Sequence, residues 1–412
     1  MLWMDVAARL GVWGAGIGSL WNKKLKLWVE GRKNLAERVA QNIKSDDCVI
    51  WFHAASYGEF EEGRPLIEAI RSQYPKYKIL VTFFSPSGYE AHKNYRYADW
   101  VFYLPIDTKK DVRDFLNAAH PEIAIFIKYE FWPNLMAELK KKQVRTFVIS
   151  ARFIPDTRFF KSYGGVFRNA LTAFETMFVQ DQRSVELLNT IGFNNAIVAG
   201  DPRFDRVKTI AGTEWSDSII EKFKNNRLVF IAGSTVGAPD EDLIQELINR
   251  HPDTQFIVVP HEMDRTPMEK MIANTKGGGK LYSECNIDTD FSSTQLLIID
   301  AVGILSKLYR YGDWGFIGGG FDKGIHSVIE ATIYGLPCAF GPNYQKNRPG
   351  IEMIANGVCC TVKDIDELDA WFTPLKNEST LAQVKQKALE YTNRNCGATE
   401  IILNQVFQGR SE

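Results

Sequence analysis

Several features that mark other protein classes are missing from this sequence of 412 residues. Its six cysteines form no Cys-x-x-Cys pair, which argues against a zinc site or a disulfide framework and favours a reducing compartment. There is no P-loop and no Gly-x-Gly-x-x-Gly, which weakens kinase and dehydrogenase interpretations. The net charge of −1 and a pI near 6.6 argue against a general nucleic-acid-binding protein. The six histidines are dispersed, so we expect neither a metal ion nor a cofactor.

The N-terminus has no apolar run long enough to span a bilayer, which takes roughly 20 residues. Its uninterrupted part, residues 10–21, follows two charged residues, Asp5 and Arg9. Tryptophans and basic residues flank this part, as is typical of a segment that lies in a membrane interface. We therefore expect residues 1–30 to be membrane-associated; the alternative is a helix packed on the first domain. A cleavable signal peptide is not expected, because the positive charge follows the apolar core.

Short apolar runs alternate with helix-like stretches along the chain, which predicts parallel sheets with helices on both faces. The length suits two domains, and the alternation pauses within residues 205–226. We expect domains at residues 31–210 and 211–412, with the last helix a candidate to pack back on the first domain. A mobile surface turn is expected at residues 274–279. Strands are expected at residues 48–53, 79–83, 100–103, 123–127, 146–149, 177–179, 196–199, 228–232, 255–259, 296–299, 314–317, 338–340 and 359–362. Helices are expected at residues 60–73, 109–119, 134–142, 184–191, 240–249, 304–311, 326–334, 350–355 and 381–393.

Polar residues follow the expected strands of the first half. Glu59 stands at the start of a helix after the first strand, where a carboxylate is well placed as a general base. The alternative for Glu59 is a glutamate favoured by the helix dipole. Ser85 and Ser87 could bind an anion or a sugar, or simply cap a helix. Arg152 could hold a carboxylate or a phosphate through its fork of donors, and Glu130 stays ambiguous.

A glycine-rich stretch in the second half follows an apolar strand. Gly318-Gly319-Gly320 leads toward a helix that is expected to begin near His326. Bare backbone N–H groups at such a start can hold a phosphate, and Glu330 could accept hydrogen bonds from a ribose. The alternative is an ordinary crossover with a glycine turn. Gly233-Ser234-Thr235 is a second plausible phosphate contact, and His261 either contacts a nucleotide or is a buried structural histidine.

Taken in order, these motifs resemble those of the 3-deoxy-D-manno-octulosonic acid (Kdo) transferases of lipopolysaccharide synthesis. The resemblance covers nearly the whole chain, including its apolar N-terminal segment. The family's His-Ala-x-Ser-x-Gly-Glu stands here as His53-Ala54-Ala55-Ser56-Tyr57-Gly58-Glu59. The other matching motifs are residues 31–34, residues 82–88, Tyr103-Leu104-Pro105-Ile106-Asp107, Glu130-Phe131-Trp132-Pro133-Asn134, Ser150-Ala151-Arg152, Ala232-Gly233-Ser234-Thr235 and residues 318–330.

The resemblance implies an α/β fold of the GT-B type, in which two Rossmann-like domains face each other across a cleft. It implies an inverting, metal-independent transfer of Kdo from CMP-Kdo to a lipid A precursor (lipid IVA) at the cytoplasmic side of the bacterial inner membrane, with Glu59 as the base. The implied acceptor-binding residues are Ser56, Gly58, Ser85, Ser87, Glu130 and Arg152. The implied donor-binding residues are Gly233, Ser234, Thr235, His261, Gly318, Gly319, Gly320, Gly324, His326, Ser327 and Glu330.

Three departures from the family pattern leave questions open. Lys128 stands where many members carry an acidic residue, and Ser327 replaces an asparagine. The family's Pro-Arg-His-Pro-Glu-Arg is here Pro260-His261-Glu262-Met263-Asp264-Arg265, so either His261 or Arg265 could take over the arginine's role. The alternatives are another GT-B enzyme that uses a UDP-sugar, as a transferase or an epimerase, and a non-catalytic carbohydrate- or lipid-binding protein of the same fold.

Overall fold

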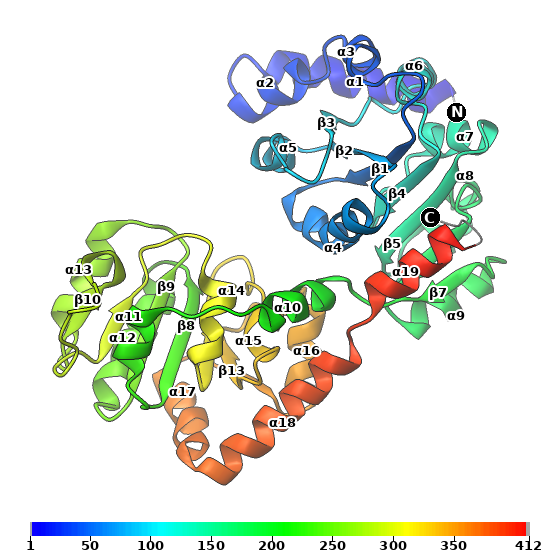
Figure 1. The fold of residues 1–412 in the computed structure, drawn as a ribbon. Coiled ribbons are helices and arrows are strands. Elements are labelled where there is room, and N and C mark those ends of the chain that lie inside the picture. Colours follow the sequence, from blue (N-terminus) through cyan, green and yellow to red (C-terminus); the bar gives the residue numbers. More distant parts are fainter. Residues whose placement is uncertain (1, 409–412) are drawn as a thin grey trace. The chain divides into compact units, whose positions relative to one another are not determined.

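The computed structural model describes residues 2–408, with side chains from Ala8 onward. The chain forms two compact units (Figure 1). Unit 1 contains the described residues up to Asp205 and those from Gly397 onward, and unit 2 contains Arg206–Cys396. The division falls at residues 205 and 206, and the last helix belongs to unit 1.

Unit 1 is built on a parallel sheet of seven strands in the order β3-β2-β1-β4-β5-β6-β7. Neighbouring residues of β1 point into opposite cores: Ile50 and Phe52 join one hydrophobic cluster and Trp51 joins the other. Helices therefore cover both faces, as a buried parallel sheet requires. The strands are β1 (Val49–Ala54), β2 (Lys78–Phe83), β3 (Trp100–Tyr103), β4 (Ile123–Ile127), β5 (Arg145–Ala151), β6 (Thr176–Val179) and β7 (Ala196–Val198).

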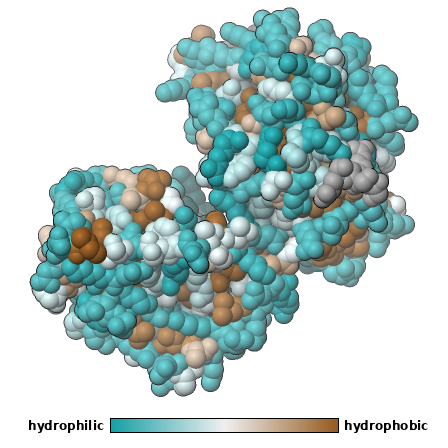
Figure 2. Space-filling view, in the orientation of Figure 1, coloured by the Kyte–Doolittle hydropathy of each residue, from teal (hydrophilic) through white to brown (hydrophobic). Residues whose placement is uncertain are grey.

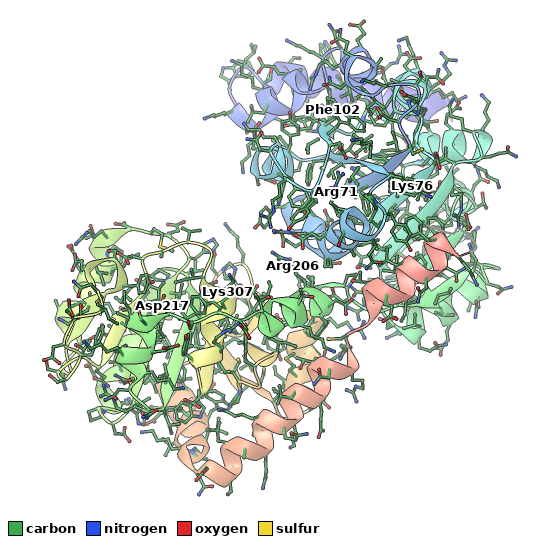
Figure 3. All side chains as sticks on the ribbon, in the orientation of Figure 1. Arg71, Lys76, Phe102, Arg206, Asp217 and Lys307 are labelled. Carbon is green, nitrogen blue, oxygen red and sulfur yellow. The ribbon has the colours of Figure 1, made fainter. Side chains whose placement is uncertain are left out.

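The first two helices of unit 1 are α1 (Leu2–Gly18) and α2 (Lys23–Glu30), which lie before the first strand in the sequence. Arg71, near the end of α4, donates to the backbone oxygen of Tyr97 in the turn before β3 (Figure 3). The remaining helices are α3 (Leu35–Asn42), α4 (Tyr57–Gln73), α5 (Pro86–His92), α6 (Lys109–Ala119), α7 (Pro133–Lys141), the short 3-10 turn η1 (Arg158–Phe160), α8 (Gly165–Leu171), α9 (Gln182–Thr190) and α19 (Ala398–Phe407).

Unit 2 repeats the plan with a second parallel sheet of seven strands, in the order β10-β11-β9-β8-β12-β13-β14. The strands are β8 (Val229–Thr235), β9 (Gln255–Pro260), β10 (Gly279–Leu281), β11 (Leu296–Ile298), β12 (Trp314–Ile317), β13 (Cys338–Phe340) and β14 (Cys359–Thr361). The helices are α10 (Arg203–Gly212), which crosses the division, α11 (Ser218–Lys224), α12 (Gly237–Arg250), α13 (Arg265–Asn274), α14 (Leu305–Leu308), α15 (Ile329–Thr332), α16 (Arg348–Ala355), α17 (Ile365–Phe372) and α18 (Glu378–Arg394), with 3-10 turns η2 (Tyr282–Glu284), η3 (Tyr309–Tyr311) and η4 (Thr373–Lys376).

Every expected strand is present, and no strand falls within residues 205–226, where the alternation was expected to pause. Residues 205–226 hold two helices, α10 and α11, and Asp217 caps α11 by accepting from the N–H groups of Ile219 and Ile220 (Figure 3). The turn expected within residues 274–279 is present at residues 276 and 277; the backbone oxygen of Gly277 accepts from Gln295, and β10 begins at Gly279. Both segments make local hydrogen bonds that the polar composition alone does not indicate.

Arg32 joins the N-terminal helices to the body of unit 1. Its guanidinium donates to the backbone oxygens of Trp28 (3.0 Å), Phe84 (2.9 Å) and Leu104 (2.9 Å). The guanidinium carbon also lies 4.1 Å from the centroid of the Trp28 ring. Burial lowers the pKa of Arg32 to about 9, which leaves it protonated near pH 7. The end of α2 is thus fixed against the loops that follow β2 and β3.

The surface of α1 carries several large apolar side chains in contact with solvent. Leu10, Trp13 and Ile17 on the helix, with Leu20 and Trp21 after it, are all exposed. On the face of the molecule drawn in Figure 2, hydrophilic residues predominate and hydrophobic ones form smaller patches. Among the described residues, no helix combines the length and the hydropathy that crossing a membrane would require.

Helix α19 completes one face of the unit 1 sheet. Phe407 stacks on Tyr74 with ring centroids 3.8 Å apart. Arg145 donates to the backbone oxygen of Val406 at 2.8 Å, and Asp205 accepts from the N–H of Thr399 at 2.7 Å. Helix α19 is therefore part of the core that supports β1 and α4.

We expect Phe407→Ala to lower the free energy of unfolding by about 3 kcal/mol, because it removes a buried ring and leaves a cavity beside Tyr74. Urea unfolding of the full chain, followed by tryptophan fluorescence, measures the change. Asn404→Ala, at an exposed position of the same helix, serves as the control and should change stability by less than about 0.5 kcal/mol. Equal effects of the two substitutions would contradict this role of α19.

Candidate functional site

The motif residues of unit 1 gather at one edge of its sheet. The loops that carry Ser56, Ser85, Asp107, Glu130 and Arg152 follow β1, β2, β3, β4 and β5 respectively. These five strands are neighbours in the order β3-β2-β1-β4-β5, and all are parallel. The carboxyl edge of such a sheet is where ligands bind in open α/β folds.

Glu59 lies in the first turn of α4, directly after β1. Its Oε2 accepts a hydrogen bond of 2.8 Å from the hydroxyl of Ser56, the residue that precedes the helix. In an ordinary capping box the serine oxygen would accept from the backbone instead, but Ser56 makes no such cap. Glu59 and Ser56 are partly exposed, and Gly58 beside them is exposed. The carboxylate is therefore oriented by one hydroxyl and still open to a substrate.

The turn after β2 has a plain structural role. Ser85 caps α5 by accepting from the N–H of Ser87 at 3.2 Å, and the two hydroxyl oxygens are 2.6 Å apart. Gly88 packs against the ring of Phe83 so closely that a Cβ there would lie 2.4 Å from it. The capping interpretation of Ser85 is confirmed, while its exposed hydroxyl still leaves it able to contact a ligand.

Glu130 is buried in a network that links three strands. Its Oε2 accepts from Nε1 of Trp132 at 2.7 Å and lies 3.0 Å from Nε2 of His53. His53 in turn lies 2.9 Å from the hydroxyl of Thr82, which accepts from Trp51 at 2.8 Å. Burial alone would raise the pKa of Glu130, but the hydrogen bonds from His53 and Trp132 hold it below its usual value. Glu130 thus has its donors inside the protein.

Arg152 follows β5 and faces solvent in part. Its Nε lies 3.3 Å from Oδ2 of Asp181, the residue that caps α9. Ser150, just before it, has φ of +55°, a backbone conformation that non-glycine residues adopt rarely. The rest of the guanidinium is exposed to solvent and can contact an anionic group.

A cluster of charges near this edge was missed from the sequence. Glu62 is fully buried on α4, and its Oε1 lies 2.6 Å from Nζ of Lys128 and 3.6 Å from Nη2 of Arg203. Burial raises the pKa of Glu62, and Arg203 opposes that shift. Asp201 accepts from Arg203 at 2.6 Å. The signal was available, since Glu62 is three residues after Glu59 and so shares its face of the helix.

The lysine that departs from the family pattern is therefore half of a buried ion pair. Lys128 has φ of +66° and donates its backbone N–H to Ile149 across the sheet edge. Its backbone conformation and its ion pair with Glu62 together fix the chain just before Tyr129 and Glu130. This residue is better described as structural support for the β4 loop than as a free cation.

An apolar groove lies beside these loops, and the sequence did not predict it. It has a volume of about 440 Å³ and runs between α1, α2 and the loops after β2, β3 and β4. Small residues of α1 form one wall, and aromatic rings form the other. The lining residues are Ala8, Gly11, Val12, Ala15, Lys24, Leu25, Trp28, Phe84, Pro86, Ile106, Asp107 and Trp132.

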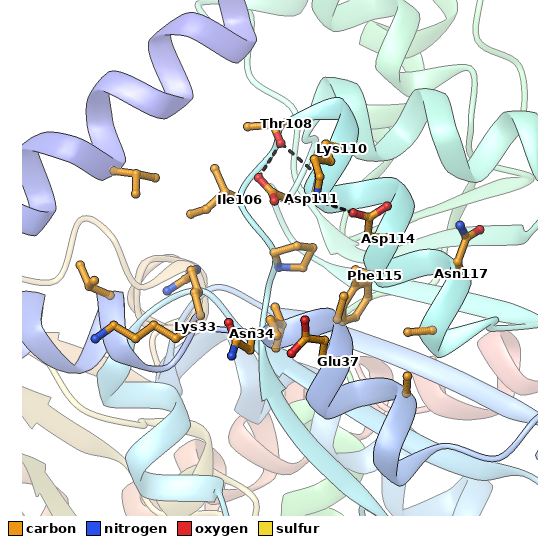
Figure 4. A pocket seen from close by; sticks show the side chains of 18 of the residues that line it. Lys33, Asn34, Glu37, Ile106, Thr108, Lys110, Asp111, Asp114, Phe115 and Asn117 are labelled. Atoms are coloured by element: carbon orange, nitrogen blue, oxygen red, sulfur yellow. Dashed lines mark hydrogen bonds and ion pairs between the residues drawn. The ribbon is translucent and has the colours of Figure 1, made fainter.

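A larger cavity of about 940 Å³ lies between α3, α6 and the residues after α2 (Figure 4). Its walls carry charges of both signs, and several of these already pair with one another. Lys110 donates to Asp114 at 2.8 Å, and Thr108 donates to Asp111 at 2.6 Å (Figure 4). None of the implied acceptor-binding residues lines it, so its size does not mark it as the site.

In unit 2 the motif loops also follow neighbouring strands. Gly233-Ser234-Thr235 ends β8, His261 follows β9, and the glycine stretch follows β12. Backbones approach closely here: a Cβ at Gly318 would lie 2.0 Å from the oxygen of Ser234, and one at Gly320 would lie 2.5 Å from the nitrogen of Gly341. These two glycines are therefore required for packing whether or not a ligand binds.

The prediction of a helix at residues 326–334 was wrong in extent, since α15 contains only Ile329–Thr332. The preceding residues are held in an open conformation by longer-range bonds. The N–H of His326 donates to Gly318, and that of Ile325 donates to Asn343 in the next loop. These bonds draw the chain away from helical geometry, so no long helix begins beside the glycines.

Asp240 fixes the glycine loop through a hydrogen bond to its backbone. This buried carboxylate accepts from the N–H groups of Gly319 and Val236, each at 2.7 Å. Burial raises the pKa of Asp240. Glu330 lies in the first turn of α15, and its charge contributes to raising the pKa of the buried Tyr309. The sequence pointed to Glu330, but it gave no sign of Asp240.

Arg265 and His261, the two candidates to replace the arginine of the family pattern, have different surroundings. Arg265 is exposed and forms ion pairs with Glu269 and Glu284. The ring of His261 instead lies against that of His326, with centroids 4.5 Å apart and an interplanar angle of 32°. His261 is exposed rather than buried, so the structural-histidine interpretation was wrong. Among the described residues, no group of three or more His, Cys, Asp or Glu is placed to hold a metal ion.

We expect Glu130→Gln to lower the free energy of unfolding by about 2 kcal/mol near pH 7, because it weakens two hydrogen bonds to a charged acceptor. The folded-state pKa of Glu130 is lowered, so its contribution is present above the unfolded pKa and is lost as pH falls through the folded value. The stability difference between wild type and variant should therefore shrink on acidification. Urea unfolding over a pH series measures it.

Glu186→Gln, at an exposed position of α9, is the matched control and should show no such pH-dependent difference. A Glu130→Gln protein as stable as wild type at every pH would show that the network does not hold the loops.

Comparisons with known proteins agree with the motifs. The family model described as 3-deoxy-D-manno-octulosonic-acid transferase (kdotransferase) matches residues 32–206. A 3-deoxy-D-manno-octulosonic acid transferase of Rickettsia bellii is 27% identical over 90% of this chain and 91% of its own length. One of Aquifex aeolicus is 24% identical over 85% of this chain and 92% of its own. A bifunctional glycosyltransferase/methyltransferase of Fusobacterium nucleatum is 28% identical over 83% of this chain, which spans only 55% of that protein.

Solved structures show the fold. A UDP-GlcNAc 2-epimerase from Neisseria meningitidis bound to UDP-GlcNAc aligns with a TM-score of 0.60 at 13% identity, over 88% of this chain and 100% of that one. A glycosyltransferase from Rickettsia africae aligns with a TM-score of 0.55 at 11% identity, over 88% and 100%. The two parallel-sheet units are thus of the GT-B type. Residues 32–206 match the Kdo transferase family model, and most of the chain is similar in sequence to curated proteins described as Kdo transferases.

Proposed function

We propose that this protein is an inverting glycosyltransferase that moves Kdo from CMP-Kdo to a lipid A precursor, with Glu59 as the general base. The observation that carries the proposal is the Glu59 carboxylate itself. It lies at the carboxyl edge of the sheet, partly exposed, and is oriented by the 2.8 Å hydrogen bond from Ser56. The names of the matched relatives support Kdo as the transferred group.

The proposed reaction is a single displacement. The acceptor hydroxyl attacks the anomeric carbon of Kdo while Glu59 accepts its proton. The new carbon–oxygen bond forms as the bond between Kdo and the phosphate of CMP breaks, and the electron pair of that bond stays on the phosphate oxygen. Ser56 would keep the carboxylate pointed at the acceptor. We propose no metal ion and no cofactor for this step.

The donor would bind to unit 2. The loops that end β8 and β12 would take the nucleotide, and Glu330 would accept hydrogen bonds from the ribose. The proposal assigns this role to Gly233, Ser234, Thr235, His261, Gly318, Gly319, Gly320, Gly324, His326, Ser327 and Glu330. Since the N–H groups of several loop residues are already bonded within unit 2, side chains would carry more of the binding than the glycine pattern alone suggests.

The acceptor would bind to unit 1, with its polar head near Ser56, Ser85, Ser87 and Arg152. The apolar groove supports an acyl-bearing acceptor, because aromatic side chains line it next to these loops. Lys24 at the groove suits the phosphates of such a lipid. The exposed apolar residues of α1 and the lysines of α2 support attachment to the cytoplasmic surface of the inner membrane.

We expect Glu59→Gln to lower the rate of Kdo transfer by about 10²- to 10⁴-fold, since it removes the proton acceptor and keeps the shape. The assay supplies CMP-Kdo, generated in situ, and a lipid A precursor in detergent micelles, with a chelator present. Glu61→Gln, a neighbour on the same helix outside the proposed machinery, is the control and should keep near wild-type activity.

Three other outcomes would count against the proposal. No product from wild type, together with consumption of a UDP-sugar, would replace the proposed reaction with one of another GT-B enzyme. No turnover of any nucleotide sugar would favour a binding protein. Equal activity in wild type and Glu59→Gln would keep the reaction and remove Glu59 as its base.

We expect Gly11→Leu to raise the KM for the acylated acceptor by about tenfold, because a leucine there would fill the groove. A Cβ at Gly11 meets no atom within 4 Å, so the helix tolerates the side chain. Gly14→Leu, which is equally open but does not line the groove, is the matched control. The kinetics are compared for the lipid and for its deacylated head group.

The deacylated acceptor should be used equally well by both variants. If Gly11→Leu impairs both acceptors, or if Gly14→Leu has the same effect, the groove does not hold an acyl chain.

A further inference from the structure

Two imidazole rings meet in unit 2 where the family pattern has an arginine. His261 comes from the loop after β9 and His326 from the loop after β12, and their ring centroids are 4.5 Å apart. His261 is exposed and His326 is half-buried. The ring of His326 lies against Gly319, where an added Cβ would stand 3.3 Å from Nε2. The pair therefore lies directly on the glycine loop.

Several backbone N–H groups of this loop are already bonded within unit 2. The N–H of Gly318 donates to Gly233, and that of Gly324 donates to Gly319. The N–H of Gly319 is held by Asp240 and that of His326 by Gly318. Because α15 is a single turn, it also offers no helix dipole of useful length. These bonded N–H groups are not available to an anion, which leaves a part for side chains in binding one.

Charged side chains near His261 and His326 come from several neighbouring helices and loops. Asp240 of α12 is committed to the backbone of the loop, and Asp322 and Lys323 are exposed within the loop itself. Glu262 follows His261 and is exposed, while Arg265 is engaged by two glutamates. Asn347, from the loop after β13, donates to the backbone oxygen of His326 at 3.3 Å. Within residues 318–330, Lys323 is the basic side chain that would compete with the histidines for a phosphate.

We propose that His261 and His326 together bind the phosphate of the donor nucleotide, and that the pair takes up a proton when the phosphate binds. This inference rests on the proposed function and gives one specific role to two of its donor-binding residues. Each imidazole donates from both nitrogens once protonated, which suits a phosphate that spans the two rings. The pair would take the place of the arginine, with a charge that depends on pH where the arginine's does not.

Without a ligand, the surroundings of His326 disfavour its charged form. Burial lowers the pKa of His326, and the neighbouring His261 lowers it further. A bound phosphate reverses this balance, because its negative charge favours the protonated rings. By linkage, a ligand that raises the pKa of His326 must bind more tightly as pH falls. Affinity for the phosphate should therefore rise on going from about pH 8 toward about pH 6.5.

The same charge would serve the reaction. In CMP-Kdo the phosphate is a diester with one negative charge, and after transfer it leaves as the monoester CMP with a second charge. The electron pair of the broken bond stays on the phosphate oxygen that the protonated pair would contact. Stabilising charge as it develops on a leaving group lowers the barrier for transfer. His261 and His326 would act on that oxygen while Glu59 accepts the proton of the acceptor.

The test measures binding of cytidine, CMP and the methyl ester of CMP to the full chain by isothermal titration calorimetry. The methyl ester keeps one charge at every pH used, so the ionisation of CMP itself does not enter. For wild type, the affinity ratio of the methyl ester to cytidine should rise about tenfold between about pH 8 and about pH 6.5. Titrations in two buffers of different ionisation enthalpy should show proton uptake.

His261→Ala and His326→Ala should each lower that ratio by about tenfold at the lower pH and abolish the proton uptake. His261→Arg should keep the ratio high but remove its dependence on pH, an effect that a merely structural role of His261 would not produce. Lys323→Ala is the matched control from the same loop and should retain both the ratio and its pH dependence.

Two results would overturn the inference while leaving the proposed function intact. One is a ratio for wild type that does not change with pH, and the other is a loss of the ratio in Lys323→Ala with both histidine variants unaffected. If wild type binds none of the three cytidine compounds but binds UDP, the proposed function itself fails and the inference falls with it.

Discussion

The hydrogen bonds to the buried carboxylate of Glu130 are the constraint on which the unit 1 site depends. His53 lies near the end of β1 and Trp132 directly precedes α7, and both contact the same carboxylate oxygen. Through Thr82 the contact extends to β2, so three neighbouring strands end in one fixed arrangement. The loop that leaves β1 carries Ser56 and Glu59, and its starting point is set by His53. A catalytic carboxylate has to be held within a fraction of an ångström, and a buried polar network of this kind provides that rigidity.

In unit 2 the buried carboxylate of Asp240 fixes the loops in a similar way. The loops that leave parallel strands have unpaired backbone groups at the very edge where a ligand binds, and each buried group needs a partner. Asp240 supplies two acceptor contacts, to Val236 and to Gly319, and so joins the loop after β8 to the loop after β12. In both units the carboxylate is neutralised mainly by N–H donors and not by a lysine or an arginine. The consequence is that rigidity is obtained without placing a fixed cation in the site, which leaves the local charge to residues such as Arg152 and the two histidines.

The sequence predicted the fold well because its strands are short, apolar and buried on both faces, so each stands out against the polar loops. It predicted the order of the motif loops for the same reason. It failed where long-range hydrogen bonds decide the conformation: residues 325 and 326 look helical, yet bonds to Asn343 and Gly318 hold them open. It also left Glu130 ambiguous, since a motif does not say whether a carboxylate points outward or is enclosed by His53 and Trp132. Glu62 was missed because its partners, Lys128 and Arg203, are brought together only by the folded sheet.

Trp132 connects the polar and the apolar halves of the unit 1 site. Its indole N–H donates to Glu130, while its ring stacks on Phe84 at 5.1 Å and lines the groove beside α1. Phe84 in turn accepts from Arg32 through its backbone oxygen, and Arg32 holds the end of α2. One chain of contacts therefore runs from the N-terminal helices, through the groove, to the network that positions the loop of Glu59. Any ligand that displaces the indole by filling the groove must also strain its hydrogen bond to Glu130, because a rigid ring cannot move at one edge alone. Occupation of the groove and the geometry around β1 are for this reason physically coupled, which gives the N-terminal helices a part in the site itself.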